Sequence, residues 1–199
     1  MTRFGIAILA GGRGTRLGGD KPDRRLGELT LLEHTLRRAR AWDAPLALVL
    51  RSFDDGARHG LKVIYDDPSI PGPMGGLAAG LVDAEAVGLE AVLTVPCDMP
   101  FLPCDLPDRL NRALQPGVAV AVAHSGGRAH PICALWRPEV LVALRERAGR
   151  GQLSLRGLSD QVGSVAVNWS VEDGDPFFNI NTLDDLAQAA LNGGVLAPG

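Results

Sequence analysis

The densest group of residues able to do chemistry lies near the N-terminus, in the glycine-rich segment 11–21. Five glycines there, at positions 11, 12, 14, 18 and 19, remove side chains, so that backbone amides can converge on an anion. Arg13, Arg16 and Lys21 add three positive charges. The segment follows the short apolar run 6–10, which is typical of a buried parallel strand. This pattern predicts a strand that opens into a phosphate-binding loop.

The glycine spacing differs from two common nucleotide-binding motifs. No Gly-Lys-Ser/Thr follows four residues after the first glycine, so the P-loop pattern is excluded. Gly12 and Gly14 supply the first two glycines of a dinucleotide-binding fingerprint, but Leu17 stands where the third glycine belongs. A simple turn is the alternative, and the three cations favour an anion site over it.

Asp98 stands at the end of the apolar run 92–97 and shortly before Pro100. A carboxylate at the end of a buried strand is costly to desolvate unless a cation or hydrogen-bond donors meet it. Mg²⁺ fits this position, because magnesium often takes one or two protein carboxylates and completes its octahedron with phosphate oxygens and water. On position alone, an Asp that accepts backbone hydrogen bonds in a turn is an equal alternative.

Composition and charge limit the possible function classes. The chain has 199 residues, 46% of them hydrophobic, which favours one α/β domain with an ample core. A net charge of −3 argues against general nucleic-acid binding. The charge is uneven, because residues 1–62 carry +5 and the rest −8, so the basic part contains the glycine-rich segment.

The cysteines and apolar runs indicate the cellular setting. Cys97, Cys104 and Cys133 are odd in number and form no C-x-x-C pair, so we expect reduced thiols and a cytoplasmic location. No apolar run reaches membrane-spanning length. We therefore expect no membrane partner.

Apolar runs alternate with helical patterns along the first part of the chain, as in βαβ units. The predicted strands are Phe4–Ala10, Leu46–Leu50, Lys62–Tyr65, Ala91–Val95, Val118–Ala123, Pro131–Trp136 and Val162–Asn168. The predicted helices are Leu31–Trp42, Met74–Ala86, Leu106–Leu114, one beginning near Pro138, and Thr182–Leu191. The expected fold is a single-domain, Rossmann-like three-layer sandwich with a mostly parallel sheet and ligands at the carboxyl ends of its strands.

Six short motifs, spread over nearly the whole chain, can be compared with known families. They are Leu9-Ala10-Gly11-Gly12, Arg16-Leu17-Gly18 with Asp20-Lys21, Gly72-Pro73-Met74-Gly75-Gly76, Pro96-Cys97-Asp98-Met99-Pro100, His130-Pro131 with Ala134-Leu135-Trp136, and Phe178-Asn179-Ile180-Asn181-Thr182. In this order they resemble the nucleotidyltransferases that activate sugars and cofactors from nucleoside triphosphates. Within that group the resemblance is closest to the molybdenum cofactor guanylyltransferases.

The resemblance implies transfer of GMP from GTP to the terminal phosphate of molybdopterin, with release of pyrophosphate. Arg16 and Lys21 would contact phosphates, and Asp98 would hold Mg²⁺ and contact the nucleotide. A phosphate nucleophile is already ionised near neutral pH, so no general base is expected. Expected partners are GTP, molybdopterin with or without molybdenum, and the proteins that insert molybdenum and mature molybdoenzymes.

Nucleotide contacts are implied for the start of the glycine-rich segment and for one aspartate. The backbone groups expected to meet the nucleobase are those of Leu9, Ala10 and Gly11. In the resembling family the second glycine, here Gly12, separates guanine users from relatives that take CTP. Asp66 matches the nucleotide-contacting aspartate, although Asp67 leaves the register open, and a turn before Pro68 is the alternative for both.

The acceptor side of the site is implied to involve Asn179, Asn181 and His130. The two asparagines alternate on an extended segment, so both can point to one side, and amides suit a pterin edge that carries donors and acceptors. Alternatively, Asn181 caps the last helix and His130 is structural. We expect a nucleotide-binding half, 1–105, and an acceptor half, 106–199, within the one domain.

Other functions remain open at this point. Gly14 stands where the family usually has Ser, and the segment 50–52 lacks an asparagine that some members use. The rivals are a molybdopterin cytidylyltransferase, a sugar-phosphate nucleotidyltransferase and a nucleotide-binding module without turnover. Arg16, Lys21 and Asp98 together favour catalysis, because a binding module has less need of a metal carboxylate.

Overall fold

A seven-stranded sheet forms the centre of the computed structural model, which describes residues 2–11, 21–51 and 60–192. Its strands are β1 (Phe4–Leu9), β4 (Leu46–Leu50), β5 (Lys62–Tyr65), β6 (Ala91–Pro96), β7 (Val120–Ser125), β8 (Arg128–Trp136) and β9 (Ser164–Trp169). They lie in the order β5-β4-β1-β6-β8-β7-β9. Among these strands β8 alone runs antiparallel to its neighbours, so the expected mostly parallel sheet is confirmed.

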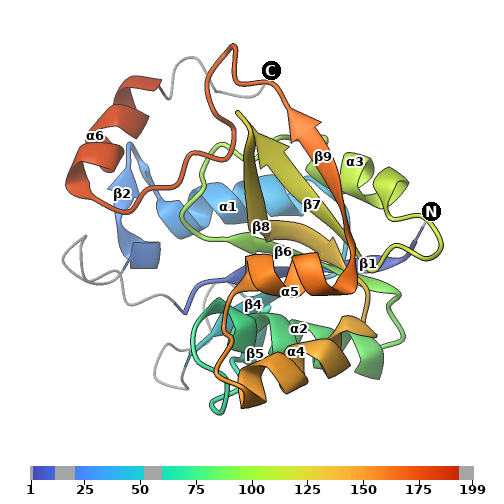
Figure 1. The fold of residues 1–199 in the computed structure, drawn as a ribbon. Helices are drawn as coiled ribbons and strands as arrows, with labels where there is room; N and C mark the ends of the chain where they lie inside the picture. Colours follow the sequence, from blue (N-terminus) through green and yellow to red (C-terminus); the bar gives the residue numbers. More distant parts are fainter. Residues whose placement is uncertain (1, 12–20, 52–59, 193–199) are drawn as a thin grey trace.

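Helices cover both faces of the sheet (Figure 1). One face carries α1 (Leu31–Arg40) and α3 (Leu106–Ala113), and the other carries α2 (Pro73–Ala86), α4 (Val140–Gly149) and α5 (Leu155–Val162). Buried side chains at helical spacing, such as Leu32 and Leu36, form the contact with the strands. The three-layer sandwich is therefore confirmed. Within the described residues, no helix has the length and apolar character needed to cross a lipid bilayer.

A small unit beside the sheet joins residues 21–30 to the last helix. It contains the 3₁₀ helix η2 (Lys21–Asp23), the short strands β2 (Arg25–Leu26) and β3 (Leu29–Thr30), and α6 (Leu183–Asn192). Leu26 and Leu31 pack with Ile180 and Ala189 in a separate apolar cluster. Figure 1 shows α6 next to β2. This packing brings the segment before α6 to the residues after the glycine-rich segment.

Helices α1 and α6 each begin with a threonine cap. Thr30 Oγ1 accepts from the Glu33 amide at 3.1 Å, and Glu33 Oε2 accepts from the Thr30 amide at 2.7 Å, which makes a complete capping box on α1. On α6 the Asp185 amide donates to Thr182 Oγ1 at 3.1 Å, and Asp185 Oδ2 accepts from the Thr182 amide at 2.8 Å. The Thr182–Asp185 pair therefore caps α6 in the same way as the Thr30–Glu33 pair caps α1.

The second half of the chain departs from the predicted elements. The strand expected at Val162–Asn168 is wrong at its start, because Val162 ends α5 and Gly163, at φ 80°, separates that helix from β9. Helix α5 was not expected. Strand β7 begins at Val120 rather than at the predicted Val118. The end of β7, at Ser125, and the start of β8, at Arg128, reach beyond the predicted bounds because the two strands form a hairpin. Its turn is Gly126 and Gly127, whose φ values of 51° and 75° suit a tight two-residue turn.

The carboxyl ends of the parallel strands define the edge that carries the candidate site. Strands β5, β4, β1 and β6 are adjacent and parallel, and Leu46–Leu50 and Lys62–Tyr65 have the predicted bounds. Gly11, Arg51, Asp66 and Asp98 follow these four strands within two residues. Ligands of open α/β sheets bind outside this edge.

Candidate active site

Three side chains from distant parts of the chain meet at the carboxyl edge of the sheet. The Lys21 ammonium forms an ion pair with Asp98 Oδ2 and donates a hydrogen bond of 2.7 Å to Asn181 Oδ1. Lys21 follows the glycine-rich segment, Asp98 follows β6, and Asn181 precedes α6. The structure therefore brings together three of the residues that the sequence indicated.

Asp98 is held in a buried position by its neighbours in the chain. Residues 91–96 of β6 are all buried, and Asp98 itself is 9% exposed. The Asp98 carbonyl accepts from the Ile180 amide at 3.0 Å, which ties the end of β6 to the segment before α6. Burial raises the pKa of Asp98 above its ordinary value, and Lys21 opposes that effect.

One oxygen of Asp98 has no hydrogen-bond partner in the described part of the chain. This atom, Oδ1, is buried, while Oδ2 is taken by Lys21. A buried carboxylate oxygen without a donor or a cation is unfavourable. The arrangement fits a divalent cation that would complete the coordination of this carboxylate when nucleotide binds.

The structure distinguishes Asp66 from Asp67. The Asp67 carboxylate accepts from the Ser69 amide at 2.9 Å and from the Ser69 hydroxyl at 2.6 Å, so it stabilises the turn after β5. Asp66 instead lies between Gly11 and Gly76, because a Cβ atom added to either glycine would come within 3.0 Å of its carboxylate. Asp66 is therefore the member of the pair that lies next to the glycine-rich segment.

The environment of Asp66 changes its protonation. Burial raises the pKa of this carboxyl from 3.8 to about 6, with Arg51 acting in the opposite direction. The charged form of Asp66 is therefore destabilised by desolvation at its position beside Gly11. Costly carboxylates of this kind are concentrated at functional sites.

The backbone at the end of β1 is partly used by the sheet. The Ala10 amide donates to the Val49 carbonyl at 2.9 Å, and the Leu9 carbonyl accepts from the Cys97 amide at 3.2 Å. Among the described residues, none makes a backbone hydrogen bond to the Ala10 carbonyl or to the Gly11 backbone, so a nucleobase edge could meet these groups. Gly12 and Arg16 were also predicted to belong to the site, and they lie outside the described residues.

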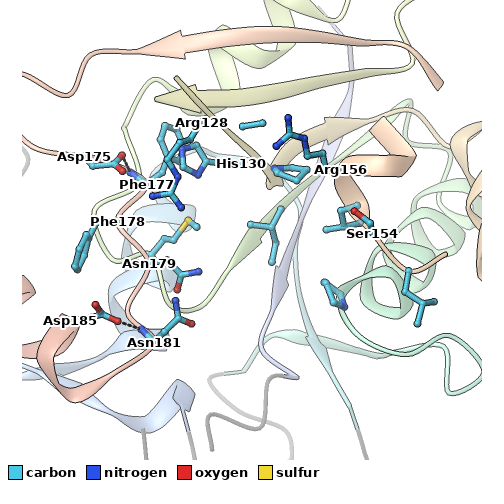
Figure 2. A pocket seen from close by; sticks show the side chains of 17 residues that line it. Arg128, His130, Ser154, Arg156, Asp175, Phe177, Phe178, Asn179, Asn181 and Asp185 are labelled. Carbon is cyan, nitrogen blue, oxygen red and sulfur yellow. Dashed lines mark hydrogen bonds between the residues drawn. The ribbon is translucent and has the colours of Figure 1, made fainter. Parts of the chain in front are cut away.

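A pocket of about 620 Å³ opens next to the cluster of Lys21, Asp98 and Asn181 (Figure 2). Asn179, Asn181 and His130, the three residues expected on the acceptor side, all line it. Asn179 Oδ1 is buried without a hydrogen-bond partner among the described residues, so one acceptor in the pocket is available to a ligand. Asn181 is bound to Lys21, and the helix cap is Thr182, so the capping role considered for Asn181 is wrong.

The pocket also contains residues that the sequence did not single out. They are Arg128, Ser154, Arg156, Asp175 and Phe177 among others. Arg128 and Arg156 make the far side of the pocket basic, and Phe177 and Phe178 provide aromatic surface (Figure 2). For Arg128 and Phe177, the sequence signal is their nearness to the motif residues His130 and Phe178.

Comparisons with known sequences show the family of this chain. Residues 6–165 match the family model of the MobA-like NTP transferase domain. A molybdenum cofactor guanylyltransferase from Nitrobacter hamburgensis is 37% identical over 204 residues, which cover 94% of this chain and 95% of the relative.

Solved structures agree in fold. The molybdopterin-guanine dinucleotide biosynthesis protein A of Archaeoglobus fulgidus has a TM-score of 0.77 at 21% identity, covering 95% of this chain and 98% of that one. A Mycobacterium tuberculosis protein solved in complex with manganese has a TM-score of 0.65 at 19% identity, covering 96% and 99%. From the sequence matches, this chain belongs to the MobA-like NTP transferases and, among them, to the molybdenum cofactor guanylyltransferase family.

Proposed function

We propose that this chain transfers GMP from GTP to the terminal phosphate of molybdopterin and releases pyrophosphate. The observation that carries the proposal is the meeting of Lys21, Asp98 and Asn181 at the mouth of the 620 Å³ pocket. Lys21 ends the glycine-rich segment in the sequence, and Asn181 lines the pocket. A triphosphate bound by the glycine-rich segment and a phosphorylated acceptor in the pocket would meet at this cluster.

The proposed reaction needs charge stabilisation more than proton transfer. The acceptor phosphate is ionised near neutral pH and attacks the α-phosphorus of GTP, while the bond to pyrophosphate breaks. The barrier comes from repulsion between two anions and from charge that gathers on the leaving pyrophosphate. Lys21 and Arg16 are proposed to offset this charge, and no residue is assigned as a general base.

A divalent cation, Mg²⁺ in our proposal, would be held by Asp98. When bound, it would supply positive charge that offsets the charge of the phosphates. The described residues contain no group of three or more His, Cys, Asp or Glu that could hold a metal, so its other ligands would be phosphate oxygens and water. The buried, unpartnered Oδ1 of Asp98 and the manganese complex of the Mycobacterium tuberculosis neighbour support this assignment.

The nucleotide and acceptor are proposed to occupy different halves of the domain. Leu9, Ala10, Gly11, Gly12 and Asp66 would bind GTP in residues 1–105, whereas Asn179, Asn181 and His130 would bind the pterin part in residues 106–199. The pocket supports this division, since apart from Pro73 and Met99 all its lining residues lie in the second half. The same proposal includes a cytoplasmic location, which the three free cysteines support, and transfer of the product to maturation proteins.

A nucleotide panel tests the proposed reaction. GTP, CTP, ATP and UTP are each incubated with the protein, Mg²⁺ and molybdopterin, and pyrophosphate release is measured. GTP is expected to give the highest rate, and the dinucleotide product should contain guanine. A preference for CTP would identify a cytidylyltransferase, and no turnover with any nucleotide would refute the catalytic proposal.

Substitution of Asp98 tests the proposed metal role. Asp98→Asn keeps the size of the side chain but removes its charge, and it is expected to lower the transfer rate by roughly a hundredfold or more. The matched control is Asp108→Asn, a similar change on the exposed side of α3, which should keep full activity. Circular dichroism and melting curves establish that both variants are folded. Full activity of folded Asp98→Asn would contradict the metal role.

A further inference from the structure

His130 is held in the pocket wall by two contacts that fix its ring. Its Nε2 atom lies 2.7 Å from Ser125 Oγ, and its ring stacks on Phe177 with centroids 4.8 Å apart and an angle of 18° between the planes. His130 is 8% exposed and Ser125 is 1% exposed. The ring is therefore oriented by a hydroxyl at one edge and by an aromatic face against its plane.

The hydrogen bonds of Ser125 determine which nitrogen of His130 carries the proton. Ser125 Oγ donates to Asp175 Oδ1 at 2.8 Å, because an ionised carboxylate can only accept. A serine hydroxyl has one proton, so Ser125 must accept from His130. The Nε2 atom of His130 is then the protonated nitrogen, and Nδ1 keeps a lone pair.

Asp175 is itself held by hydrogen bonds, so the order of donors and acceptors from His130 through Ser125 to Asp175 is fixed. The same Oδ1 atom accepts from the Phe177 amide at 2.9 Å, and the Asp175 carbonyl accepts from the Phe178 amide at 3.1 Å. These bonds tie the carboxylate to the segment that also carries Asn179. These hydrogen bonds therefore connect Asp175 to Ser125 on β7 and then to His130 on β8.

The surroundings of His130 favour the neutral ring. Burial lowers the pKa of His130, Asp175 opposes this effect, and Arg128 and His124 add to it. Nδ1 has no hydrogen bond to any described residue, and His130 is part of the pocket lining. A neutral imidazole in this arrangement can only accept a hydrogen bond from a ligand in the pocket.

We propose that Ser125 and Asp175 are positioning residues that hold His130 as the Nε2–H tautomer, so that Nδ1 accepts a hydrogen bond from an N–H group of the pterin. This inference rests on the proposed function for the identity of the ligand. His130 would then determine specificity, because a ligand ring whose edge carries only hydrogen-bond acceptors would find no donor at Nδ1 of His130. The amide of Asn179 supplies complementary acceptor and donor groups nearby.

Nitrogen-15 NMR of histidine-labelled protein tests the tautomer without any assay of activity. Wild-type His130 is expected to show a protonated Nε2 and an unprotonated Nδ1 in the absence of substrate. Ser125→Ala is expected to remove this bias, whereas Ser159→Ala should keep it. Ser159 is the matched control because it is also buried, at 4% exposure, and its hydroxyl only donates to the Arg156 carbonyl at 2.8 Å. A protonated Nδ1 in the wild type would overturn the proposal.

Binding of 6-hydroxymethylpterin tests recognition separately from transfer. Addition of this pterin is expected to shift the Nδ1 resonance of His130 in wild type, and an unchanged resonance at saturating pterin would overturn the recognition role. His130→Phe keeps the aromatic stack but has no acceptor, so its Kd for the pterin should rise about tenfold. Ser125→Thr, which retains the hydroxyl, should restore the tautomer that Ser125→Ala loses.

Kinetics distinguish a failure of this inference from a failure of the proposed function. Ser125→Ala is expected to raise the KM for molybdopterin about tenfold and to leave the KM for GTP unchanged. Absence of transfer by the wild type would refute the proposed function, while the tautomer and pterin experiments would still decide the role of His130. Equal KM values for molybdopterin in wild type and folded Ser125→Ala would overturn the positioning role.

Discussion

Lys21 and Asp98 form an ion pair in which the two side chains are only 11% and 12% exposed. Asn181 accepts from the same ammonium, so a positive charge already lies between two oxygen atoms that face the site. In the absence of substrate this ammonium compensates the buried carboxylate. In the proposed function, a cation held by Asp98 would share this carboxylate with the Lys21 ammonium, and the two positive charges would repel each other.

The first prediction follows from this competition for Asp98. Mn²⁺ without nucleotide should bind the wild-type protein weakly, because the ammonium repels a second cation. Lys21→Met removes the charge but keeps an apolar chain of similar length, and it is expected to tighten Mn²⁺ binding about tenfold. The measurement is the electron paramagnetic resonance signal of free Mn²⁺ during titration.

The other lysine of the chain provides the control. Lys62 is ion-paired with Asp83 on α2, away from the carboxyl edge of the sheet. Lys62→Met should leave Mn²⁺ binding unchanged. If Lys21→Met and Lys62→Met bind Mn²⁺ equally, Asp98 is not the metal ligand.

The second prediction concerns Asp66 and the pH dependence of stability. The pKa of this carboxyl is about 6 in the folded protein, against 3.8 for an aspartate in its ordinary, exposed state. A proton is thus bound more tightly in the folded state, and the contribution to stability falls as the pH rises from about 4 to about 6. Asp66→Asn has no such loss, so its melting temperature should exceed that of wild type at a pH of about 7.5.

The control for Asp66 is its neighbour Asp67. Hydrogen bonds from Ser69 lower the pKa of Asp67, so its charged form stabilises the fold. Asp67→Asn should therefore lower the melting temperature at a pH of about 7.5, or leave it unchanged, because this carboxyl lies largely in solvent. Equal stabilisation by both substitutions, or a gain from Asp66→Asn that is the same at about pH 4 and about pH 7.5, would contradict the assignment.

The parts of the site that follow strands were predictable from sequence. Asp98 comes after an apolar run whose residues are all buried, and the carboxyl ends of parallel strands must share one edge. The register of Asp66 against Asp67 was not predictable, because both residues follow β5 directly. Two tertiary features separate them: Gly11 and Gly76 approach the Asp66 carboxylate, and Ser69 donates to the Asp67 carboxylate.

The hydrogen bonds within the pocket wall could not be predicted, because they join remote segments. Ser125 and Asp175 are 50 residues apart, and no local pattern connects them. Helix α5 has eight residues and contains Gly157, so its periodic signal is short and its intrinsic helix propensity is low. Burial of Leu155 and Leu158 against the sheet, a tertiary effect, stabilises this helix.

The third prediction concerns the close contact between α2 and the turn after β5. A Cβ atom on Gly75 would lie 2.3 Å from the Ile70 carbonyl oxygen and 3.0 Å from the Asp67 carbonyl oxygen. Both atoms belong to the backbone, so Gly75→Ala should shift the turn that carries Asp66 and reduce the free energy of unfolding by about 1–3 kcal/mol. Urea denaturation measures this change.

Gly80 on the same helix is the matched control for Gly75. Its added Cβ would lie 3.4 Å from Ala7 Cβ and 3.5 Å from Val92 Cγ1, which are ordinary packing distances. Gly80→Ala should be neutral or stabilise the protein by up to about 1 kcal/mol, since alanine has the higher helix propensity. If Gly75→Ala is as stable as Gly80→Ala, the turn is not held in place by the close approach of α2.

The last prediction separates the stability of α6 from its role at the pocket. Thr182 caps α6 directly after Asn181, and Asp185 Oδ2 also accepts from the Asn181 amide at 2.9 Å. Thr182→Ala should cost about 1 kcal/mol of stability and loosen the position of Asn181. The KM for molybdopterin is therefore expected to rise several-fold.

Thr30→Ala is the control, because Thr30 caps α1 with the same geometry but does not line the pocket. It should cost a similar free energy, measured by urea denaturation, and leave the KM for molybdopterin unchanged. This pair of variants distinguishes a general loss of stability from a local displacement of the acceptor segment. Equal KM values in the two variants would mean that Asn181 is held by its bond to Lys21 rather than by the helix cap.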